Sequence, residues 1–203
     1  MDFEDLTLVD GRLRLWRGFL AANAADDYFN ALGREAAWEQ SVIRIYGREC
    51  PIPRLNAWHG DPGAAYTYSG RCFQPHPWTP ALLEVKQRIE SLTDAAFNSV
   101  LVNLYRDGND SVSWHSDDEP ELGQNPVIAS VSLGAERKFV LKHKRRRDLP
   151  PVNLWLPTGS LLLMSGETQH HWTHQVPKTR KSVGQRINLT YRLVRHMATR
   201  AAS

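Results

Sequence analysis

The sequence predicts an α+β fold with a mainly β core, in which a β-sandwich or jelly roll carries two helices on its outside. Six short strand-like runs follow one another in the second half of the chain, and turn signals such as Asp107-Gly108, Gly134 and Pro150-Pro151 separate them. Short strands at this spacing favour a sandwich over units in which strands alternate with helices. A chain of 203 residues, 41% of them hydrophobic, can bury one sizeable core without disulfides.

Two helices are predicted ahead of these strands. The first covers residues 23–38, with Asn23 as its N-cap and Asp26 three residues further on. The second begins after Thr79, because Pro80 suits the first position of a helix. Its apolar residues step by three and four and therefore share one buried face. They are Leu82, Val85, Ile89 and Leu92.

The predicted strands cover residues 99–105, 127–133, 137–143, 152–156, 160–164 and 186–194. The chain contains no internal repeat and no low-complexity linker, so we expect the strands and helices to form one compact unit.

Composition narrows the class of protein further. The two cysteines, Cys50 and Cys72, are not in a CxxC spacing, which argues against a zinc finger or a disulfide framework. No apolar run approaches the roughly 20 residues of a membrane span, and the acidic start Met-Asp-Phe-Glu-Asp is unlike a signal peptide. We therefore expect no membrane partner and a cytoplasmic location.

The charge is only mildly basic, with a net charge of +3 and a pI near 9.0. Its distribution is more informative, because residues 142–147 form one dense basic run, Lys-His-Lys-Arg-Arg-Arg. Such a run can bind the phosphates of a nucleic acid. The alternative is a solvated hairpin loop, and the run alone does not decide between the two.

The motif His115-Ser116-Asp117 is the first sign of chemistry. In an extended segment, His115 and Asp117 point to one face and can bind one cation from the same side. A second histidine would complete the two-His, one-carboxylate triad that suits non-haem iron(II) and leaves coordination positions open.

The third ligand must come from a distant part of the chain, where His170, His171 and His174 are the candidates. The separation between Asp117 and His174 is 174 − 117 = 57 residues, which leaves room for several intervening strands. Three histidines so close together cannot all bind one metal ion, and local chemistry does not separate them.

The last predicted strand alternates strictly over residues 186–192. Arg186, Asn188, Thr190 and Arg192 share one face, with the two arginine Cα atoms about 20 Å apart. Two guanidinium groups at this separation can converge on opposite ends of a short dicarboxylate, and arginine suits carboxylate binding. A metal triad beside such a strand predicts a site for 2-oxoglutarate.

Asn103-Leu104-Tyr105 lies shortly before the first metal candidates, and its two polar side chains share a strand face. In this order the motifs resemble those of the AlkB family of 2-oxoglutarate-dependent dealkylating dioxygenases. The motifs are Asn103-Leu104-Tyr105, Asp107-Gly108, His115-Ser116-Asp117, His174 and Arg186-Ile187-Asn188-Leu189-Thr190-Tyr191-Arg192.

The resemblance spans roughly residues 43–194 and is nearest to the DNA-repair branch that acts on duplexes. The segments that carry this nearer match are Ile45-Tyr46-Gly47, Thr67-Tyr68-Ser69-Gly70, His115-Ser116-Asp117-Asp118-Glu119 and Lys142-His143-Lys144. It implies a double-stranded β-helix with His174 as the third iron ligand and His171 beside the ligands or on the substrate side. It assigns 2-oxoglutarate to Asn103, Tyr105, Arg186, Asn188, Thr190 and Arg192.

The resemblance also implies a division of roles along the chain. Residues 1–98 would form an N-terminal extension and nucleotide-recognition lid with its flanking helices, and residues 99–203 the catalytic core. Tyr46 would fill the gap that a flipped base leaves, and Glu119 would contact the exocyclic group of the base. The substrate-binding residues implied are Tyr46, Gly47, Arg48, Tyr66, Thr67, Tyr68, Ser69, Asp118 and Glu119.

The implied protein is a monomeric enzyme that uses iron(II), 2-oxoglutarate and O2 to demethylate N-alkylated bases of the 1-methyladenine and 3-methylcytosine type. Its partner would be alkylated DNA or RNA, in the nucleoid of a bacterium or the nucleus of a eukaryote. Three alternatives remain: the same chemistry on RNA or a protein side chain, a non-catalytic nucleic-acid-binding β-domain, and a cupin-like metal hydrolase. The triad and the arginine pair argue against the last two.

Overall fold

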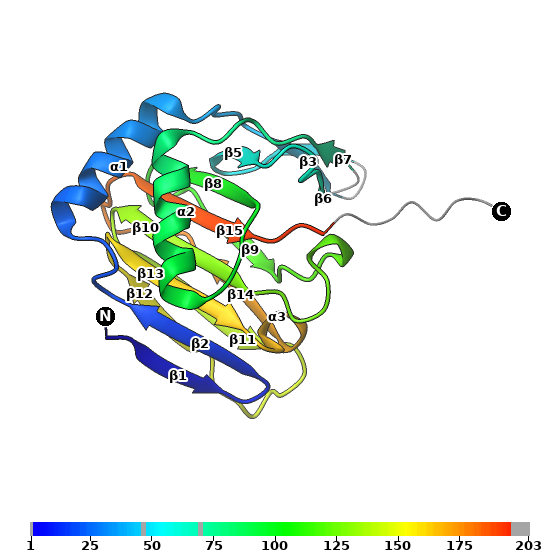
Figure 1. Cartoon of the computed structure of the whole chain (residues 1–203). Helices are drawn as coiled ribbons and strands as arrows, with labels where there is room; N and C mark the ends of the chain where they lie inside the picture. The colour runs from blue at the N-terminus through cyan, green and yellow to red at the C-terminus, as the bar shows by residue number, and fades with distance from the viewer. Residues whose placement is uncertain (1, 46–47, 69–70, 196–203) are drawn as a thin grey trace.

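The structure is a computed structural model that describes residues 2–45, 48–68 and 71–195 (Figure 1). Two antiparallel sheets form its centre. The larger has seven strands, in the order β1 (Glu4–Leu8), β2 (Gly11–Trp16), β13 (Ser160–Ser165), β10 (Ile128–Gly134), β15 (Arg186–Arg192), β8 (Ser99–Tyr105) and β5 (Leu55–Gly60). The smaller has four, in the order β12 (Val152–Leu156), β11 (Arg137–His143), β14 (Trp172–Val176) and β9 (Val112–His115). The predicted mainly β core is confirmed.

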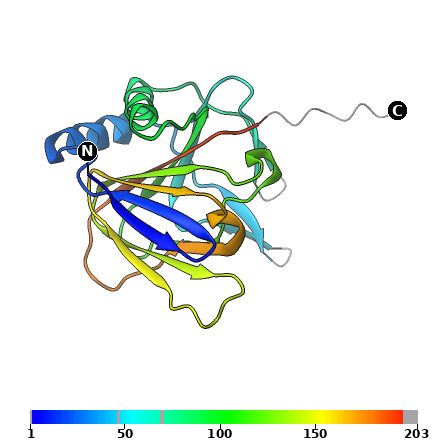
Figure 2. The same ribbon diagram turned by 60° about the horizontal axis from the view of Figure 1, so that its bottom comes forward.

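Two helices cover the outer face of the larger sheet, as predicted (Figure 1). They are α1 (Ala22–Glu35) and α2 (Pro80–Thr93). Leu32 of α1 and Val85 and Ile89 of α2 are fully buried against the strands. The hydroxyl of Tyr191 donates to the carbonyl of Leu82 at 2.9 Å and ties β15 to α2. Figure 2 shows the helices on one side of the molecule and the smaller sheet on the other.

The first residues of the two helices can be compared with the predicted N-caps. α2 begins as expected, since the Thr79 hydroxyl accepts a hydrogen bond from the Leu82 amide and Pro80 is the first helical residue. The prediction for Asn23 is wrong, because α1 begins at Ala22 and its N-cap, Ala21, makes no side-chain cap. Packing fixes this start instead: Leu20 is buried, and its amide donates to the carbonyl of Gly159.

Three of the six predicted strands, β8, β11 and β12, have the predicted bounds. β10 is shifted by one residue, β13 is one residue longer, and β15 ends at Arg192 rather than at Val194. The sequence did not predict the remaining elements. They are β1, β2, β5, β9, β14, a short α3 (Thr168–His171), a 3-10 turn at Pro120–Leu122, and the hairpins β3–β4 (Val42–Ile45, Arg48–Pro51) and β6–β7 (Tyr66–Tyr68, Arg71–Phe73).

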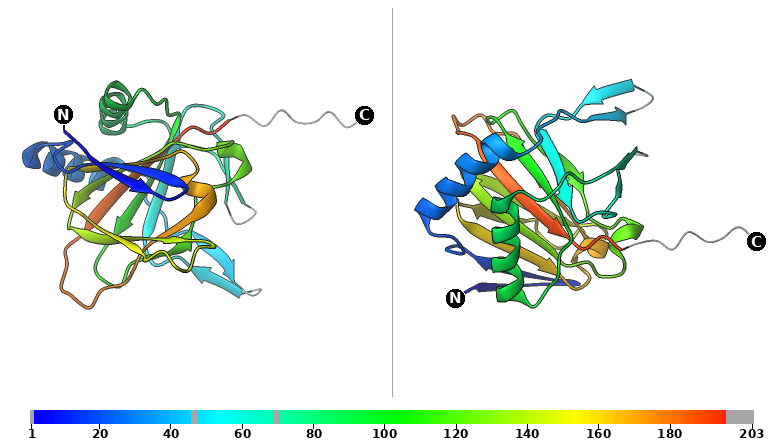
Figure 3. Two further views of the ribbon diagram at one scale, coloured as in Figure 1. Left: turned by 90° about the horizontal axis from the view of Figure 1, so that it is seen from below. Right: turned by 45° about the horizontal axis from the view of Figure 1, so that its top comes forward.

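The core between the two sheets is apolar over most of its area. Leu13, Leu162, Leu141 and Leu154 meet there from four different strands. At one end this apolar filling gives way to buried polar side chains, and the two small hairpins project from the same end (Figure 3). Since β1, β2 and β5 belong to the larger sheet, residues 1–98 and 99–203 share one sheet. Their division into lid and catalytic core stays a prediction.

The loop between β8 and β9 places the first metal candidate and is held by a buried carboxylate. Both Asp110 oxygens accept hydrogen bonds from Arg106, at 2.8–2.9 Å, and the Asp110 carbonyl accepts from Arg137. Burial by itself raises the pKa of Asp110, but the hydrogen bonds from Arg106 outweigh it and hold that pKa below its usual value.

We expect Asp110→Asn to lower the free energy of unfolding by about 1–3 kcal/mol at neutral pH. Because the folded-state pKa is depressed, the stabilisation is present above the unfolded value of 3.8 and is lost as pH falls through the folded value. Urea unfolding at neutral pH and near the unfolded pKa measures this. Asp148→Asn, whose partner Arg146 is exposed, is the control and should change little. A difference that does not shrink in acid would contradict this role.

Candidate metal centre and its two cavities

His115, Asp117 and His174 come together between the sheets, with one ligand atom of each within 4.8 Å of the others. His115 ends β9 and stands opposite His174 in the pairing of β9 with β14. Asp117 reaches the group from the loop after β9 rather than from an extended strand. Two histidines and one carboxylate are the donor set that suits iron(II).

The hydrogen bonding of His115 prepares it to coordinate a metal. Its Nδ1 lies 2.8 Å from the carbonyl oxygen of Ser113, and since a carbonyl only accepts, Nδ1 must donate. The lone pair is therefore on Nε2. Burial lowers the pKa of His115, and burial together with the nearby His115 lowers the pKa of His174 to about 3. Both imidazoles are neutral at neutral pH, which is the form that binds metals.

The structure places the three C-terminal histidines differently, of which the family resemblance implied His174 as the ligand. His174 is buried and lies in the group. The ring of His171 stacks on His143 at 5.8 Å, and its Nε2 lies 3.4 Å from Glu167. His170 accepts a hydrogen bond from the amide of Asn125. Only His174 of the three can share a metal ion with His115 and Asp117.

Asp117 is held from two sides. Its carboxylate pairs with Arg192, and although burial by itself raises the pKa of Asp117, Arg192 and the two histidines hold it below its usual value. Its main-chain amide donates to Oε1 of Gln169 at 2.9 Å, and Gln169 is fully buried on α3. Lys144 joins the same loop to α3, because its amine donates to Asp118 and to the Gln169 carbonyl, both at 2.8 Å.

One cavity beside this group is lined by the polar face of β15. Arg186, Asn188, Thr190 and Arg192 are all buried and line it, as do Asn103 and Tyr105 of the neighbouring β8. The strand register pairs Asn188 with Asn103 and Arg186 with Tyr105. The predicted alternation therefore brings all six residues to one cavity.

Among these residues, Arg186 gives the clearest indication of the ligand that the cavity fits. It is 1% exposed, and burial lowers its pKa. Its Nη2 donates to the Ser132 hydroxyl at 2.9 Å, while Nε and Nη1 have no hydrogen-bond partner among the described residues. A buried guanidinium with two unused donors is costly unless an anion binds it. The donor set thus fits a carboxylate of 2-oxoglutarate.

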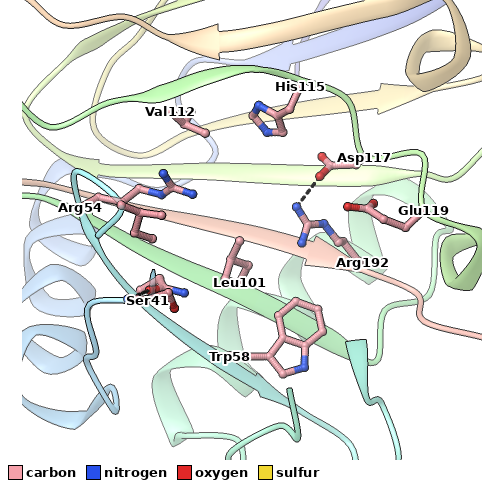
Figure 4. A pocket seen from close by; sticks show the side chains of 11 residues that line it. Ser41, Arg54, Trp58, Leu101, Val112, His115, Asp117, Glu119 and Arg192 are labelled. Atoms are coloured by element: carbon pink, nitrogen blue, oxygen red, sulfur yellow. Dashed lines mark hydrogen bonds and ion pairs between the residues drawn. The ribbon is translucent and has the colours of Figure 1, made fainter. Parts of the chain in front are cut away.

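A second cavity adjoins the first and shares His115, Asp117 and Arg192 with it (Figure 4). Its walls are largely apolar, with Trp58 and Leu101 facing His115 and Asp117 across the space, and Glu119 is at its edge. The indole of Trp58 donates to the Ala64 carbonyl at 3.0 Å, which fixes the plane of the ring. A flat wall with a carboxylate at the edge suits a planar, positively charged ring.

The sequence did not single out Arg54, which lines both cavities. Arg54 is buried, and its Nε donates to Oδ1 of Asn103 at 2.7 Å, so the Asn103 amide group is turned into the cavity as a donor. The only signal in the sequence is a charged residue directly before the apolar strand β5, a position usually exposed.

The predicted substrate residues divide into three groups. Tyr46, Gly47 and Ser69 lie outside the described residues, and of Tyr66, Thr67 and Tyr68 only the backbone, in β6, is described. Arg48 is exposed at the start of β4. Glu119 lines the second cavity, and Asp118 beside it is paired with Lys144.

The basic run does not form one continuous charged surface. His143 is buried, Lys144 pairs with Asp118, and Arg146 pairs with Asp148. The Lys142 amine lies 5.1 Å from the centre of the Trp114 ring. The run is thus partly neutralised by its own neighbours.

Comparison with known protein families agrees with the donor geometry and the strand order described above. A family model described as the 2OG-Fe(II) oxygenase superfamily matches residues 12–192. The chain belongs to this superfamily. Its metal is therefore iron(II), with 2-oxoglutarate and O2 as cosubstrates.

Relatives in the superfamily confirm the resemblance to the AlkB family. Alpha-ketoglutarate-dependent dioxygenase alkB homolog 3 of Mus musculus is 43% identical over 191 residues, which cover 90% of this chain and 66% of that protein. DNA oxidative demethylase ALKBH2 of Bos taurus is 40% identical over 179 residues, covering 84% and 64%. This chain spans slightly less than two thirds of the length of these relatives.

A solved structure of OsALKBH1 matches this chain with a TM-score of 0.62 at 19% identity, over 94% of this chain and all of that one. The similarity confirms the predicted double-stranded β-helix. Among the described residues, no helix is long and apolar enough to cross a membrane.

We expect Gln169→Ala to weaken iron(II) binding roughly tenfold, because partners that orient metal ligands typically contribute that much. The loss follows from releasing the Asp117 amide and the loop that carries the carboxylate. Competition with a chelator under anaerobic conditions measures the metal affinity without turnover. Gln169→Glu keeps the accepting oxygen and should retain most of the affinity, and His170→Ala on the same short helix is the control. Wild-type affinity in Gln169→Ala would contradict this role.

Proposed function

We propose that this chain is an iron(II)- and 2-oxoglutarate-dependent dioxygenase that demethylates N-alkylated bases, of the 1-methyladenine and 3-methylcytosine type, in DNA. The observation that carries the proposal is the position of the two cavities. His115, Asp117 and Arg192 line both of them. A cosubstrate in the polar cavity and a base in the apolar one would therefore meet at the same metal.

His115, Asp117 and His174 hold the iron in this proposal. Bound iron(II) with 2-oxoglutarate and O2 supplies the oxidising power that hydroxylates an N-methyl carbon, after which formaldehyde leaves. The chain itself keeps both imidazoles neutral and the carboxylate ionised, so that the ligand set stays ready to bind across the neutral pH range.

Arg186 binds the distal carboxylate of 2-oxoglutarate through its two unused donors, in the proposal. Tyr105 lies against the same guanidinium, 5.2 Å from the ring centre, and Asn103 offers its amide group. Asn188 and Thr190 shape the floor of the cavity. Arg192 keeps Asp117 ionised and lies where the other carboxylate approaches the metal.

The apolar cavity receives the damaged base, which must leave the stack to reach the metal. Trp58 supports one face of its ring, and Glu119 attracts a cationic lesion such as 1-methyladenine or 3-methylcytosine. Tyr46, Gly47, Arg48, Tyr66, Thr67, Tyr68 and Ser69 belong to the proposed lid. Asp118, whose carboxylate pairs with Lys144, stays a proposed substrate residue next to Glu119. The relatives named as alkB homolog 3 and as a DNA oxidative demethylase support a nucleic-acid substrate. That the enzyme acts as a monomer stays a prediction.

The alternative is the same chemistry on RNA or on a protein side chain. A methylated lysine is flexible and tetrahedral and would make poor use of the flat wall at Trp58. RNA shares the bases of DNA, so the assay below includes both.

The test of the function is a formaldehyde and succinate assay on methylated single- and double-stranded DNA, on methylated RNA and on a methyl-lysine peptide. We expect turnover on the nucleic acids with wild type and with His171→Ala. His174→Ala should lose turnover and iron together, because a ligand is gone. Iron loss in His171→Ala but not in His174→Ala would refute the ligand set, and turnover on the peptide alone would refute the substrate class.

We expect Arg186→Ala to weaken 2-oxoglutarate binding by about 1.5–3 kcal/mol, the range for hydrogen bonds to charged groups. Calorimetric titration of the iron-loaded or manganese-substituted protein gives the affinity, and thermal unfolding checks the fold. Arg180→Ala removes an exposed arginine from the loop before β15 and is the matched control. Equal affinities in Arg186→Ala and wild type would remove Arg186 from the cosubstrate site.

A further inference from the structure

The outer face of the smaller sheet carries a pattern that the proposed active site does not use. Trp155 alternates with the buried Leu154 and Leu156 of β12 and so points away from the core. Lys142 is exposed on β11, between the buried Leu141 and His143. Trp114 of β9 lies beside the Lys142 amine and is therefore on the same face. Figure 2 shows this sheet on the side of the molecule away from the helices.

Both tryptophans are unusually open for their size. Trp114 is 40% exposed and Trp155 is 44% exposed, and they are the two exposed tryptophans in the described part of the chain. Each has a lysine amine over its ring, Lys142 at 5.1 Å from the centre for Trp114 and Lys181 at 5.4 Å for Trp155. An indole face with an adjacent cation offers a stacking surface and a charge for the group attached to the stacked ring.

The charge of the face is positive. Lys138 stands opposite Trp155 in the pairing of β11 with β12, and a shallow pocket beside Trp155 is also lined by Lys178 and Lys181. Glu136 is the acidic residue that lines this pocket. The two rings are separated by β14 and β11, so they form two isolated stacking sites rather than one apolar patch. This pattern suits a polyanion with spaced aromatic rings better than a protein partner, which would use a contiguous apolar surface.

The outer face of the smaller sheet also lies close to the candidate metal ligands. Trp114 directly precedes His115, so the edge strand β9 carries a metal candidate toward the interior and an exposed ring toward solvent. From β9 to β12 the sheet spans three strand spacings, roughly 14 Å. A strand that leaves the base cavity would meet Trp114 first and could reach Trp155 within a few nucleotides.

We propose that this face binds an unpaired nucleic-acid strand flanking the target base, with bases stacking on Trp114 and Trp155 and phosphates meeting Lys142, Lys181 and Lys138. The inference rests on the proposed function and adds a strand preference to it. A duplex keeps its bases paired and stacked inside and cannot use isolated indole platforms, whereas a single strand can. The face therefore favours single-stranded substrate.

The test compares two substrates that carry the same 3-methylcytosine: a trinucleotide, too short to reach Trp155, and a single strand of about 15 nucleotides, the upper range of one such site. The readout is the ratio of kcat/KM for the long substrate to that for the short one. We expect Trp155→Ala to lower this ratio roughly tenfold, as expected for one lost stacking contact. Trp155→Phe keeps a ring and should retain most of the ratio. Leu83→Ala, an exposed apolar residue on α2, is the control and should leave the ratio at the wild-type value.

Trp114→Ala should also lower the ratio of kcat/KM values. Trp155→Ala is the decisive variant, because Trp155 is far from the candidate metal ligands. In the double variant Lys142→Ala, Lys181→Ala the salt dependence of binding to an unmodified single strand should flatten by about 0.7 in slope for each lost phosphate contact. An unchanged ratio in Trp155→Ala, or an unchanged salt slope, would overturn the inference. A wild-type enzyme that acts on neither substrate would refute the proposed function instead, which is a distinguishable outcome.

Discussion

The burial of two guanidinium groups between the sheets is the constraint on which the rest of the site depends. Arg186 and Arg192 lie on the central part of the larger sheet, at 1% and 4% exposure, where an uncompensated charge is strongly destabilising. Arg192 is compensated by Asp117. Arg186 donates to the Ser132 hydroxyl, and among the described residues its Nε and Nη1 have no hydrogen-bond partner. The fold thus carries one charge balanced internally and one that a ligand must balance.

A buried charge of this kind needs a rigid surrounding structure, which the pairing of β15 with its neighbouring strands supplies. β15 pairs over its whole length with β8 on one side and over most of it with β10 on the other. The opposite face of the same strand is anchored by Ile187, Leu189 and Tyr191, which are buried under the two helices. Apolar packing on one face of β15 therefore stabilises an arrangement of polar groups on the other that would be unfavourable alone.

The alternation of residues 186–192 is local, so the sequence alone was enough to place four polar side chains on one face. The strand bounds of β8, β11 and β12 were predictable for the same reason. Local sequence did not separate His174 from His170 and His171, because that choice depends on the pairing of β14 with β9, in which His174 faces His115, 174 − 115 = 59 residues away. Only the family resemblance implied His174. Arg54 and Gln169 were missed because their burial is a product of distant contacts, with Asn103 in one case and the Asp117 amide in the other. The short strands β9 and β14 carry too few residues for a periodic signal.

The edge position of β9 links the candidate metal centre to the surface of the protein. In the described part of the chain, β9 pairs with one strand, β14, and its other edge makes no strand pairing. That openness lets the residues after His115 turn into the loop that brings Asp117 to the site and Glu119 to the cavity. It also leaves Trp114 uncovered on the outside, supported by Lys142 from the next strand but one. In the inference proposed above, a nucleic-acid strand whose base enters the cavity continues across this ring, because Trp114 directly precedes the candidate ligand His115 on β9.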